Sequence, residues 1–456
     1  MTKILAAAEA AVKLAMKRGF DEAEAFSTKT TRREIIYRNA IEATMSNTIA
    51  GLSIRGVVDK RIGFYSVSSL ERADIENAVE QSLKIAKANT QDQDWKSLTR
   101  KHGKAAVQKV FDKRIESLSA KDLVGEVQLA VDTVTEVDSS LSITRGILST
   151  TIVSNAIANS HGCKLERKET FASTWIAVTA GSSGKKGIGH EARQTRSWKS
   201  LNTEHIAETV AERALKMVNA TSISNGKMDA VWRNDAFAAI LDAMLTRTVT
   251  ADAVQKHRSP WVGKVGQPVA SEQVSLIDEG KMPGGLGTRQ FDDDGTPQRS
   301  TPVIEKGVLR GFLYDVYTAS KENRQSTGNA RREGGLFSTR PNYTQAPFPY
   351  PNNLILKPQT AAPEEVIKET GKGVYIVETI GEWLSNPISG DLSAAISSGF
   401  KIENGELGAA VKGGIVTANF FEILKGKMDL RANDLDSSGA VYAPTTQVLD
   451  MTIAGE

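Results

Sequence analysis

The chain has a single cysteine, Cys163, among 456 residues. One cysteine excludes an internal disulfide and a thiolate metal cluster, and it fits a reducing cytoplasm. No uncharged apolar run approaches the roughly 20 residues that a membrane-spanning helix needs. Charged residues such as Glu9 and Lys13 interrupt residues 1–20, which therefore lack the apolar centre of a secretory signal. These absences predict a soluble, cytoplasmic protein.

A strong excess of charge of either sign is also lacking. The 57 lysines and arginines nearly balance the 54 aspartates and glutamates, which leaves a formal net charge of +3. A nucleic-acid-binding protein would carry a concentrated basic face. We therefore expect neither a nucleic acid nor a membrane as a partner.

Histidines are few, and none is spaced as a zinc motif requires. The five lie at positions 102, 161, 190, 205 and 257, so no two are four or five residues apart. His190-Glu191 is half of a metallopeptidase pattern without its second histidine, and we interpret it as part of a surface loop. His161 and Cys163 are too close in sequence to form a thiol–imidazole pair readily, so we expect a buried structural cysteine.

Other patterns for catalysis or phosphate binding are missing as well. The chain has no Gly-x-Ser-x-Gly elbow and no phosphate-binding Gly-x-x-x-x-Gly-Lys-Ser/Thr loop. Gly284-Gly285-x-Gly287 is not followed by a helix that would present amides to a phosphate. Asp292-Asp293-Asp294-Gly295 lacks the alternating ligands of a calcium loop, and we predict a turn there.

What is present predicts an α+β fold. Helices are expected at residues 1–20, 72–88, from Ser119 onward with a capping box to Asp122, and at 204–219. Between them, short strands are expected at 23–28, 33–38, 41–47, 51–58, 62–67, 141–148, 150–157, 164–170 and 174–179. The order helix, strands, helix occurs twice, which indicates a duplicated unit. Residues 92–109 are polar and irregular, and we expect an exposed excursion.

Residues 219–227 are short, polar and glycine-containing, and we place the domain boundary there. We predict an N-terminal α+β domain over residues 1–220 and a C-terminal β-rich, sheet or barrel-like domain over 228–456. Asn404-Gly405 and Lys306-Gly307 predict tight hairpins in the second domain. Its other expected elements are strands at 375–379 and 448–453 and helices near 317–322, 363–370 and 419–425.

Residues 237–247 predict the first helix of the second domain. Apolar residues recur at three- and four-residue spacing along it, so one stripe should face a core. These residues are Phe237, Ile240, Leu241, Met244 and Leu245.

The segment Thr327-Gly328-Asn329-Ala330-Arg331-Arg332 combines a turn with paired arginines. Two guanidinium groups in a loop would suit carboxylates, including a peptide C-terminus, or backbone carbonyls. We predict that Thr327, Gly328, Asn329, Arg331 and Arg332 form a loop that faces a peptide or a partner. The alternative is that both arginines make structural ion pairs with acidic loop residues.

Several C-terminal segments, in order and spacing, resemble the TldD/PmbA family, and the similarity extends over essentially the whole chain. The segments are Phe291-Asp-Asp-Asp-Gly-Thr-Pro297, Val303-Ile-Glu-Lys-Gly-Val-Leu-Arg-Gly-Phe-Leu-Tyr-Asp315, Ser326-Thr-Gly-Asn-Ala-Arg-Arg332, Ile402-Glu-Asn-Gly-Glu406, Ala432-Asn-Asp-Leu435, Ala443-Pro-Thr445 and Met451-Thr-Ile-Ala-Gly455. The resemblance implies two domains and a cytoplasmic assembly of two homologous subunits. It also implies that the TldD-type subunit is a zinc peptidase with a His-Glu-x-x-x-His motif and a cysteine ligand. The PmbA (TldE) type lacks these residues, and the family acts on small or unfolded peptides.

Aligned with that motif, this chain has Asp242 and Arg247 at the histidine positions and Ala243 at the glutamate. An arginine stays protonated and is a very poor metal ligand, and without the glutamate no base remains for zinc-bound water. The region of the ligand cysteine offers Asp436, Ser437 and Ser438 instead. The resemblance thus implies a subunit with no cofactor of its own, with zinc in a TldD-type partner.

We therefore predict a metal-free subunit of a TldD/PmbA-type heterodimer that degrades or processes small unfolded peptides. The alternative is a metal-free homodimer that binds peptides or a protein without hydrolysis. A third, weaker hypothesis is an independent peptidase that uses Cys163.

Overall fold

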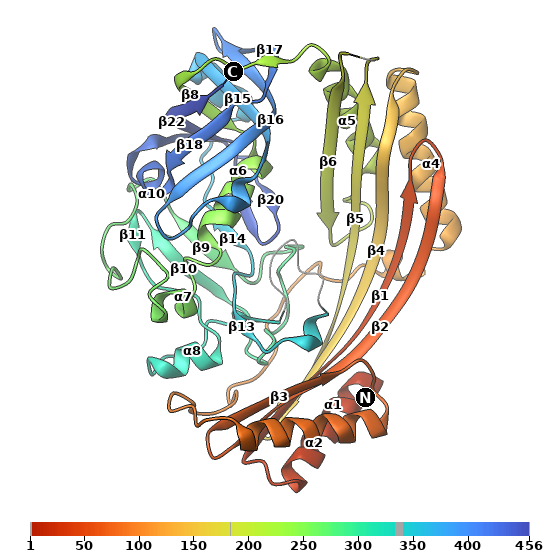
Figure 1. The fold of residues 1–456 in the computed structure, drawn as a ribbon, viewed down its shortest axis with the longest axis vertical. Helices are drawn as coiled ribbons and strands as arrows, with labels where there is room; N and C mark the ends of the chain where they lie inside the picture. Colours follow the sequence, from red (N-terminus) through yellow and green to blue (C-terminus); the bar gives the residue numbers. More distant parts are fainter. Residues whose placement is uncertain (1, 183, 333–340, 456) are drawn as a thin grey trace.

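The computed structural model describes residues 2–182, 184–332 and 341–455, so Met1 and Glu456, the outer ends of the two predicted domains, lie outside the described residues. Two β-rich bodies face each other, one of long curved strands and one of shorter strands (Figure 1). The predicted α+β class is confirmed. None of the described helices is long and apolar enough to cross a membrane.

The N-terminal body is a six-stranded antiparallel sheet in the order β3-β2-β1-β4-β5-β6. Each half runs helix, three strands, helix, with one additional short helix at the start of the second half. The halves meet where β1 pairs with β4, so the order of elements repeats as the sequence indicates. The first half is α1 (Lys3–Lys17), β1 (Glu22–Tyr37), β2 (Ile41–Val58), β3 (Arg61–Val67) and α2 (Arg72–Ala88). The second is α3 (Lys113–Ser117), α4 (Ala120–Val137), β4 (Ser142–Asn159), β5 (Lys164–Ala180), β6 (Gly187–Thr195) and α5 (Thr203–Met217).

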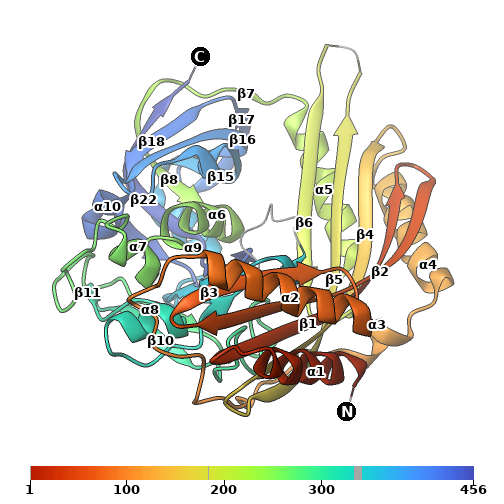
Figure 2. The same ribbon diagram turned by 60° about the horizontal axis from the view of Figure 1, so that its bottom comes forward.

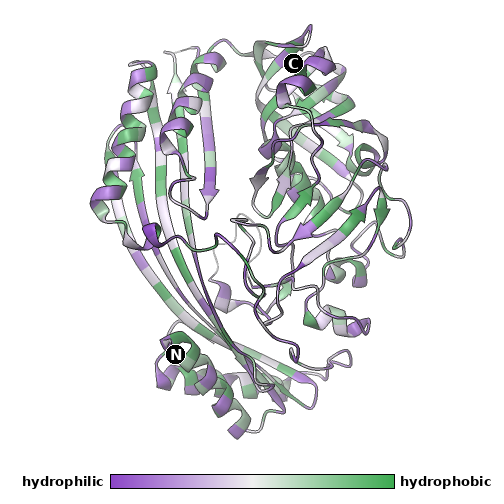
Figure 3. Ribbon diagram, turned by 180° about the vertical axis from the view of Figure 1, so that it is seen from behind, coloured by the Kyte–Doolittle hydropathy of each residue, from purple (hydrophilic) through white to green (hydrophobic). Residues whose placement is uncertain are grey.

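Helix α1 packs on β1 and also on β4 of the other half, α2 packs on β2 and β3, and α5 packs on β5 and β6 (Figures 1 and 2). Side chains alternate between the two faces of a strand, which is visible as banding by hydropathy in Figure 3. In β1, Ala23 and Ala25 belong to the apolar core under α1 and α2. Glu24 and Phe26 point to the opposite face, where they meet residues of the C-terminal body. Because side chains alternate along a strand, every second residue of this part of β1 faces the C-terminal body and can join the two bodies.

The sequence predicts pairs of short strands at four places where the structure has one long strand. Each of β1, β2, β4 and β5 is one strand of 16 to 18 residues. Gly51 was expected to begin a new strand, yet it lies inside β2. A Cβ at Gly51 would overlap the ring of Tyr343, so this glycine permits close approach of a loop rather than a break.

Residues 92–109 are irregular, as expected, but they are not an exposed excursion. Trp95 and Leu98 are buried beside Val57. The backbone N–H of Gly103 donates to Gly295 O at 3.2 Å, so the segment runs from the N-terminal sheet to a loop of the other body. Sparse apolar residues suggested exposure, but tertiary contacts bury the few that are present.

The C-terminal body combines two sheets around one core. In the larger sheet, neighbouring strands pair in the spatial order β15-β8-β22-β18-β16. Strand β15 also pairs with β16, so these strands form a closed ring. This sheet comprises β7 (Thr221–Ser222), β8 (Gly226–Trp232), β15 (Lys372–Ile380), β16 (Asp391–Glu403), β17 (Glu406–Lys412), β18 (Ile415–Asn419), β19 (Met428–Arg431) and β22 (Thr446–Ala454). The other comprises β9 (Leu276–Glu279), β10 (Ser300–Glu305), β11 (Val308–Leu309), β14 (Leu354–Leu356), β20 (Asp436–Ser438) and β21 (Val441–Ala443). Segment 219–227, predicted as the domain boundary, supplies β7, which pairs with β17.

Shorter elements complete this body. They are β12 (Ala330–Arg331), β13 (Phe348–Pro349), α6 (Asn234–Leu245), α7 (Ala251–Gln255), α8 (Val316–Lys321), α9 (Pro363–Thr370) and α10 (Phe420–Glu422), which continues into a π-helical turn (Ile423–Lys427). Both predicted hairpins are confirmed, because Asn404 and Gly405 have φ of 54° and 77° and Lys306 and Gly307 have 48° and 78°.

Helix α6 lies in the middle of the C-terminal core. The five residues of its predicted apolar stripe are all at most 1% exposed. The helix begins three residues earlier than expected and ends at Leu245, so Arg247 lies beyond its last turn. This placement leaves Asp242 and Ala243 on the less buried side of the helix.

Candidate functional site

The candidate site starts from the half-buried side of α6. Asp242 and Ala243 are half-buried, and Arg247 is exposed. The pKa of the Asp242 carboxyl is raised to about 6, chiefly by burial, while Arg247 opposes this rise and Glu382 adds to it. Within the described part of the chain, the buried Oδ1 of Asp242 has no hydrogen-bond partner. A buried carboxylate oxygen without a hydrogen-bond partner is unusual for a purely structural residue.

Strand β20 lies beside this part of α6. A Cβ built on Gly439, directly after β20, would be 3.9 Å from Asp242 Oδ2. The structure therefore brings together the two places that the sequence singled out, the helix and residues 436–438. Asp436 is already paired, since Arg193 Nη1 of β6 donates to both of its carboxylate oxygens at 2.7 and 2.6 Å.

These side chains do not fit a zinc site. Asp242 offers one carboxylate, Ala243 offers no ligand, and the Arg247 guanidinium carries only donors. The second nearby acid, Asp436, is engaged by Arg193. In the part of the chain that the structure describes, no group of three or more His, Cys, Asp or Glu residues is placed to hold a metal ion.

The predicted loop after α8 folds inward. Thr327 Oγ1 donates to Asn329 Oδ1 at 2.6 Å, and Asn329 Nδ2 donates to Asp278 Oδ2 at 2.7 Å. Gly328 has φ of 80° and so occupies the left-handed region that favours glycine. Asn329 is fully buried in the chain.

Arg331 and Arg332 also turn inward. The Arg331 guanidinium lies 5.6 Å from the centroid of the Tyr350 ring. Arg332 is 1% exposed, and its Nη2 donates to Glu24 Oε1 of β1 at 2.5 Å. For Arg332 this geometry matches the alternative of structural ion pairs, although the acid comes from the N-terminal sheet. Contact of this loop with a peptide or partner stays a prediction.

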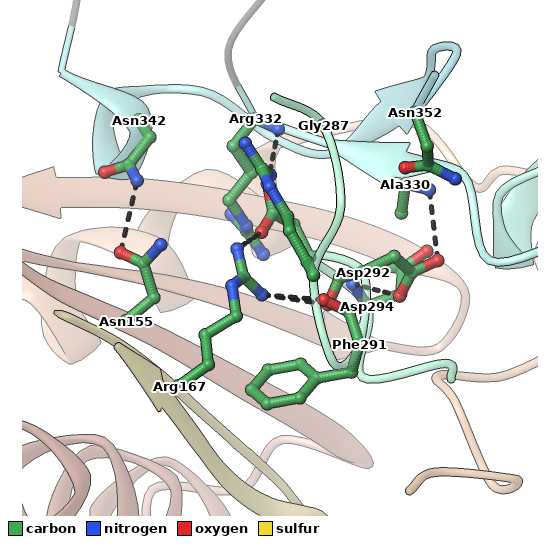
Figure 4. Close-up of polar contacts among 12 residues, drawn as sticks. Asn155, Arg167, Gly287, Phe291, Asp292, Asp294, Ala330, Arg332, Asn342 and Asn352 are labelled. Carbon is green, nitrogen blue, oxygen red and sulfur yellow. Dashed lines mark hydrogen bonds and ion pairs between the residues drawn. The ribbon is translucent and has the colours of Figure 1, made fainter. Parts of the chain in front are cut away.

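The turn at residues 292–294 is confirmed as a turn, but it is also the centre of a buried charge network. Asp292 Oδ1 accepts from the backbone N–H groups of Asp294 and Thr296, at 3.0 and 2.8 Å. Figure 4 shows Arg167 from β5 and Arg332 converging on this turn. Arg167 Nη2 donates to Asp293 Oδ1 at 2.5 Å.

Arg55 of β2 makes a second bridge between the bodies. Its Nη2 donates to Glu24 Oε2 at 2.9 Å and to Asp294 Oδ1 at 2.8 Å. Burial alone would raise the pKa of Asp293, but Arg167 and Arg289 outweigh it and hold the pKa at about 2. Among the described residues no arginine forms an ion pair with Asp292, and burial together with the like charge of Asp294 raises its pKa. Acids and arginines from distant segments thus neutralise one another and fix the two bodies together.

Sequence reasoning missed this network. Its members are separated by up to 308 positions, as between Glu24 and Arg332. The available signal was the charged residues Glu24 and Arg55 within otherwise apolar or small stretches of two strands. An isolated charge on a buried strand face requires a partner from elsewhere.

The remaining candidates have structural partners. His190 lies in β6, not in a surface loop, and pairs with Glu378, while Glu191 is buried between Arg213 and Arg233. His161 Nε2 is 2.6 Å from Glu22 Oε1. Cys163 is fully buried, and burial raises the pKa of its thiol to about 12. A buried thiol that stays protonated is not a nucleophile.

Comparison with known proteins agrees with this architecture. Three family profiles match consecutive segments: PmbA/TldA metallopeptidase domain 1 over residues 23–86, the central domain over 112–218 and the C-terminal domain over 225–455. An uncharacterized protein of Methanocaldococcus jannaschii is 25% identical over 438 residues, which cover 96% of this chain and 97% of that protein. The metalloprotease PmbA homolog of Haemophilus influenzae is 23% identical and covers 98% and 94% of the two chains. The fold resembles the crystal structure of TldE from Thermococcus kodakarensis, with a TM-score of 0.89, 24% identity and coverage of 98% and 100%.

Proposed function

This chain belongs to the PmbA/TldD metallopeptidase family, and from that premise we propose that it is a metal-free, non-catalytic subunit of a peptidase of this type. Its partner is a TldD-type chain that carries zinc. The assembly is a cytoplasmic heterodimer that degrades or processes small unfolded peptides.

The observation that carries the proposal is the set of side chains where α6 meets β20. Asp242, Ala243 and Arg247 supply one carboxylate, a methyl group and a permanent cation. Arg193 neutralises Asp436 on the adjoining strand. No base is left at Ala243 to take a proton from a metal-bound water. The described chain keeps the helix that would support a metal motif, but its side chains suit neither metal binding nor proton abstraction.

An open strand edge supports the binding of extended peptides. Among the described strands, β3 pairs only with residues 52–58 of β2, so residues 41–51 are paired on one side only, with β1. An extended peptide can add to such an edge through backbone hydrogen bonds, which gives affinity with little sequence preference. That property suits substrates that are unfolded and varied.

The test compares the chain alone with the chain co-expressed with a TldD-type subunit. Alone, it should contain no stoichiometric zinc and should not cleave an unstructured fluorogenic peptide. Together, the two should elute as a 1:1 complex whose cleavage is sensitive to a chelator. Tight zinc binding and chelator-sensitive cleavage by the lone chain would contradict the proposal.

The second candidate is a metal-free homodimer that binds peptides or a protein without hydrolysis. Exposed apolar residues in segment 380–388, such as Trp383 and Leu384 at 51% and 81% exposure, would suit burial against another chain of either kind. Light scattering discriminates between the candidates. A stable self-dimer that does not bind the TldD-type chain would favour the homodimer.

A further inference from the structure

A pocket of about 540 Å³ lies where the N-terminal and C-terminal bodies meet, away from α6. One wall is formed by residues 96–102, which cross from one body to the other. The opposite wall is formed by residues 296–299, by α8 and by residues 324–326. This volume lies within the range of small-molecule sites.

The described lining of this pocket carries basic side chains and no acidic one. The basic residues are Lys96, Arg100, Lys101, His102, Arg299 and Arg324. The whole chain, in contrast, has nearly equal numbers of acids and bases. Five of these six are lysines or arginines, the residue types that provide cations in proteins. The fold therefore gathers positive charge that is balanced elsewhere in the molecule.

Most of this charge is not neutralised within the chain. Lys96, Lys101 and Arg299 have no hydrogen bond or ion pair from their side chains in the described residues. Arg100 Nη2 is 3.7 Å from Glu22, and Arg324 Nε is 3.3 Å from the partly exposed Glu322. Like charges held together without counter-charges are unfavourable, and an anion that enters the pocket would relieve this repulsion.

The wall is held in place before any ligand binds. The backbone N–H of Leu98 donates to Glu22 Oε2 at 3.1 Å, and Asn159 Nδ2 donates to Thr99 O at 2.8 Å. Thr99 lines the pocket and is 3% exposed. These two hydrogen bonds fix the backbone of the segment that carries Lys96, Arg100 and Lys101.

We propose that this pocket binds a small polyanion that carries at least two phosphate or carboxylate groups. The three cations without a counter-charge in the described chain, Lys96, Lys101 and Arg299, exceed what one singly charged group can neutralise. Arginine and lysine together suit oxyanions, because the guanidinium fork makes paired hydrogen bonds and the ammonium acts as a compact charge. The site is separate from the peptidase role proposed above and does not depend on it.

The test is titration calorimetry of the full chain with inorganic pyrophosphate and, in parallel, with citrate. The proposal requires saturable 1:1 binding of at least one of them, and the comparison distinguishes phosphate from carboxylate ligands. Replacing both exposed cations, K101Q/R299Q, should weaken that binding by about tenfold or more, because charge-assisted hydrogen bonds are strong.

The matched control is K84Q/K87Q on α2, which removes the same charge from an exposed surface elsewhere. It should leave the affinity within about twofold, since exposed charges beyond about 10 Å are screened by salt. Two results would overturn the proposal. One is the absence of saturable binding of either anion, and the other is equal weakening by both double variants, which would indicate non-specific attraction.

Discussion

Replacing Asp242 with asparagine isolates the free-energy cost of holding this carboxylate in the candidate site. In the folded chain burial raises its pKa from the usual 3.8 to about 6. The folded state therefore binds more protons than the unfolded state between about pH 4 and pH 6. Because of this difference, the contribution of Asp242 to stability falls as pH rises through that window. Asparagine does not titrate, so D242N removes this part of the pH dependence.

The magnitude follows from the two pKa values. A difference of about two pKa units corresponds to about 3 kcal/mol, at about 1.4 kcal/mol per unit. Asp242 is only half-buried, so water screens part of this cost. As the pH rises from about 4 to about 7, the unfolding free energy of D242N minus that of wild type should increase by about 1–2 kcal/mol. An unpaired amide in this position would cost the same at every pH, so it does not affect this difference.

The assay is equilibrium urea unfolding followed by tryptophan fluorescence at about pH 4.5, 5.5, 6.5 and 7.5, the range that the linkage relation identifies. The control is D252N on α7, which removes a carboxylate whose side chain is 42% exposed and paired with Lys256. This carboxylate is more exposed than Asp242, so D252N should not show the gain with rising pH that is expected of D242N. A D242N profile that runs parallel to that of wild type would refute the reasoning about Asp242.

Two further predictions concern how the bodies and layers are held together. Arg332→Met leaves the fully buried Glu24 short of a cation and should destabilise the chain by about 3–5 kcal/mol in thermal unfolding. Adding Glu24→Gln should recover part of this loss, and a double variant no more stable than R332M would contradict direct pairing. Gly63→Ala should cost about 1–3 kcal/mol in urea unfolding, because its Cβ would overlap the carbonyl oxygen of Ser82 in α2. Gly125→Ala, with open space around it in α4, should instead gain about 0.5–1 kcal/mol, and equal effects of the two alanines would refute the steric argument.

Local features of the fold were predictable from sequence because their causes are local. The capping box between Ser119 and Asp122 forms as expected, and α2 and α9 have the predicted bounds. The hairpin at Asn404-Gly405 forms because both residues tolerate positive φ. The length of β1 was underestimated because the polar residues 29–32 interrupt its apolar pattern, whereas backbone pairing with β2 on one side and β4 on the other continues the strand through them.

The candidate site was predictable only in part. The sequence placed Asp242 and Ala243 on an amphipathic helix and identified residues 436–438 as the second region of interest. It gave no basis for the ion pair between Arg193 and Asp436, which joins β6 to β20. Nor did it indicate that Arg332 would be buried, because a paired arginine and a solvated one look alike in a sequence.

The sequence by itself determined which chemical groups this protein can use. It contains no histidine between positions 205 and 257 and one cysteine in total, whatever the fold. Tertiary structure alone decided which charges neutralise one another and which stay unbalanced. It pairs Arg332 with Glu24, and it gathers Lys96, Lys101 and Arg299 around one pocket. The physical reason is that backbone propensity acts over a few residues, whereas the cost of a buried charge depends on every segment that the fold brings near it.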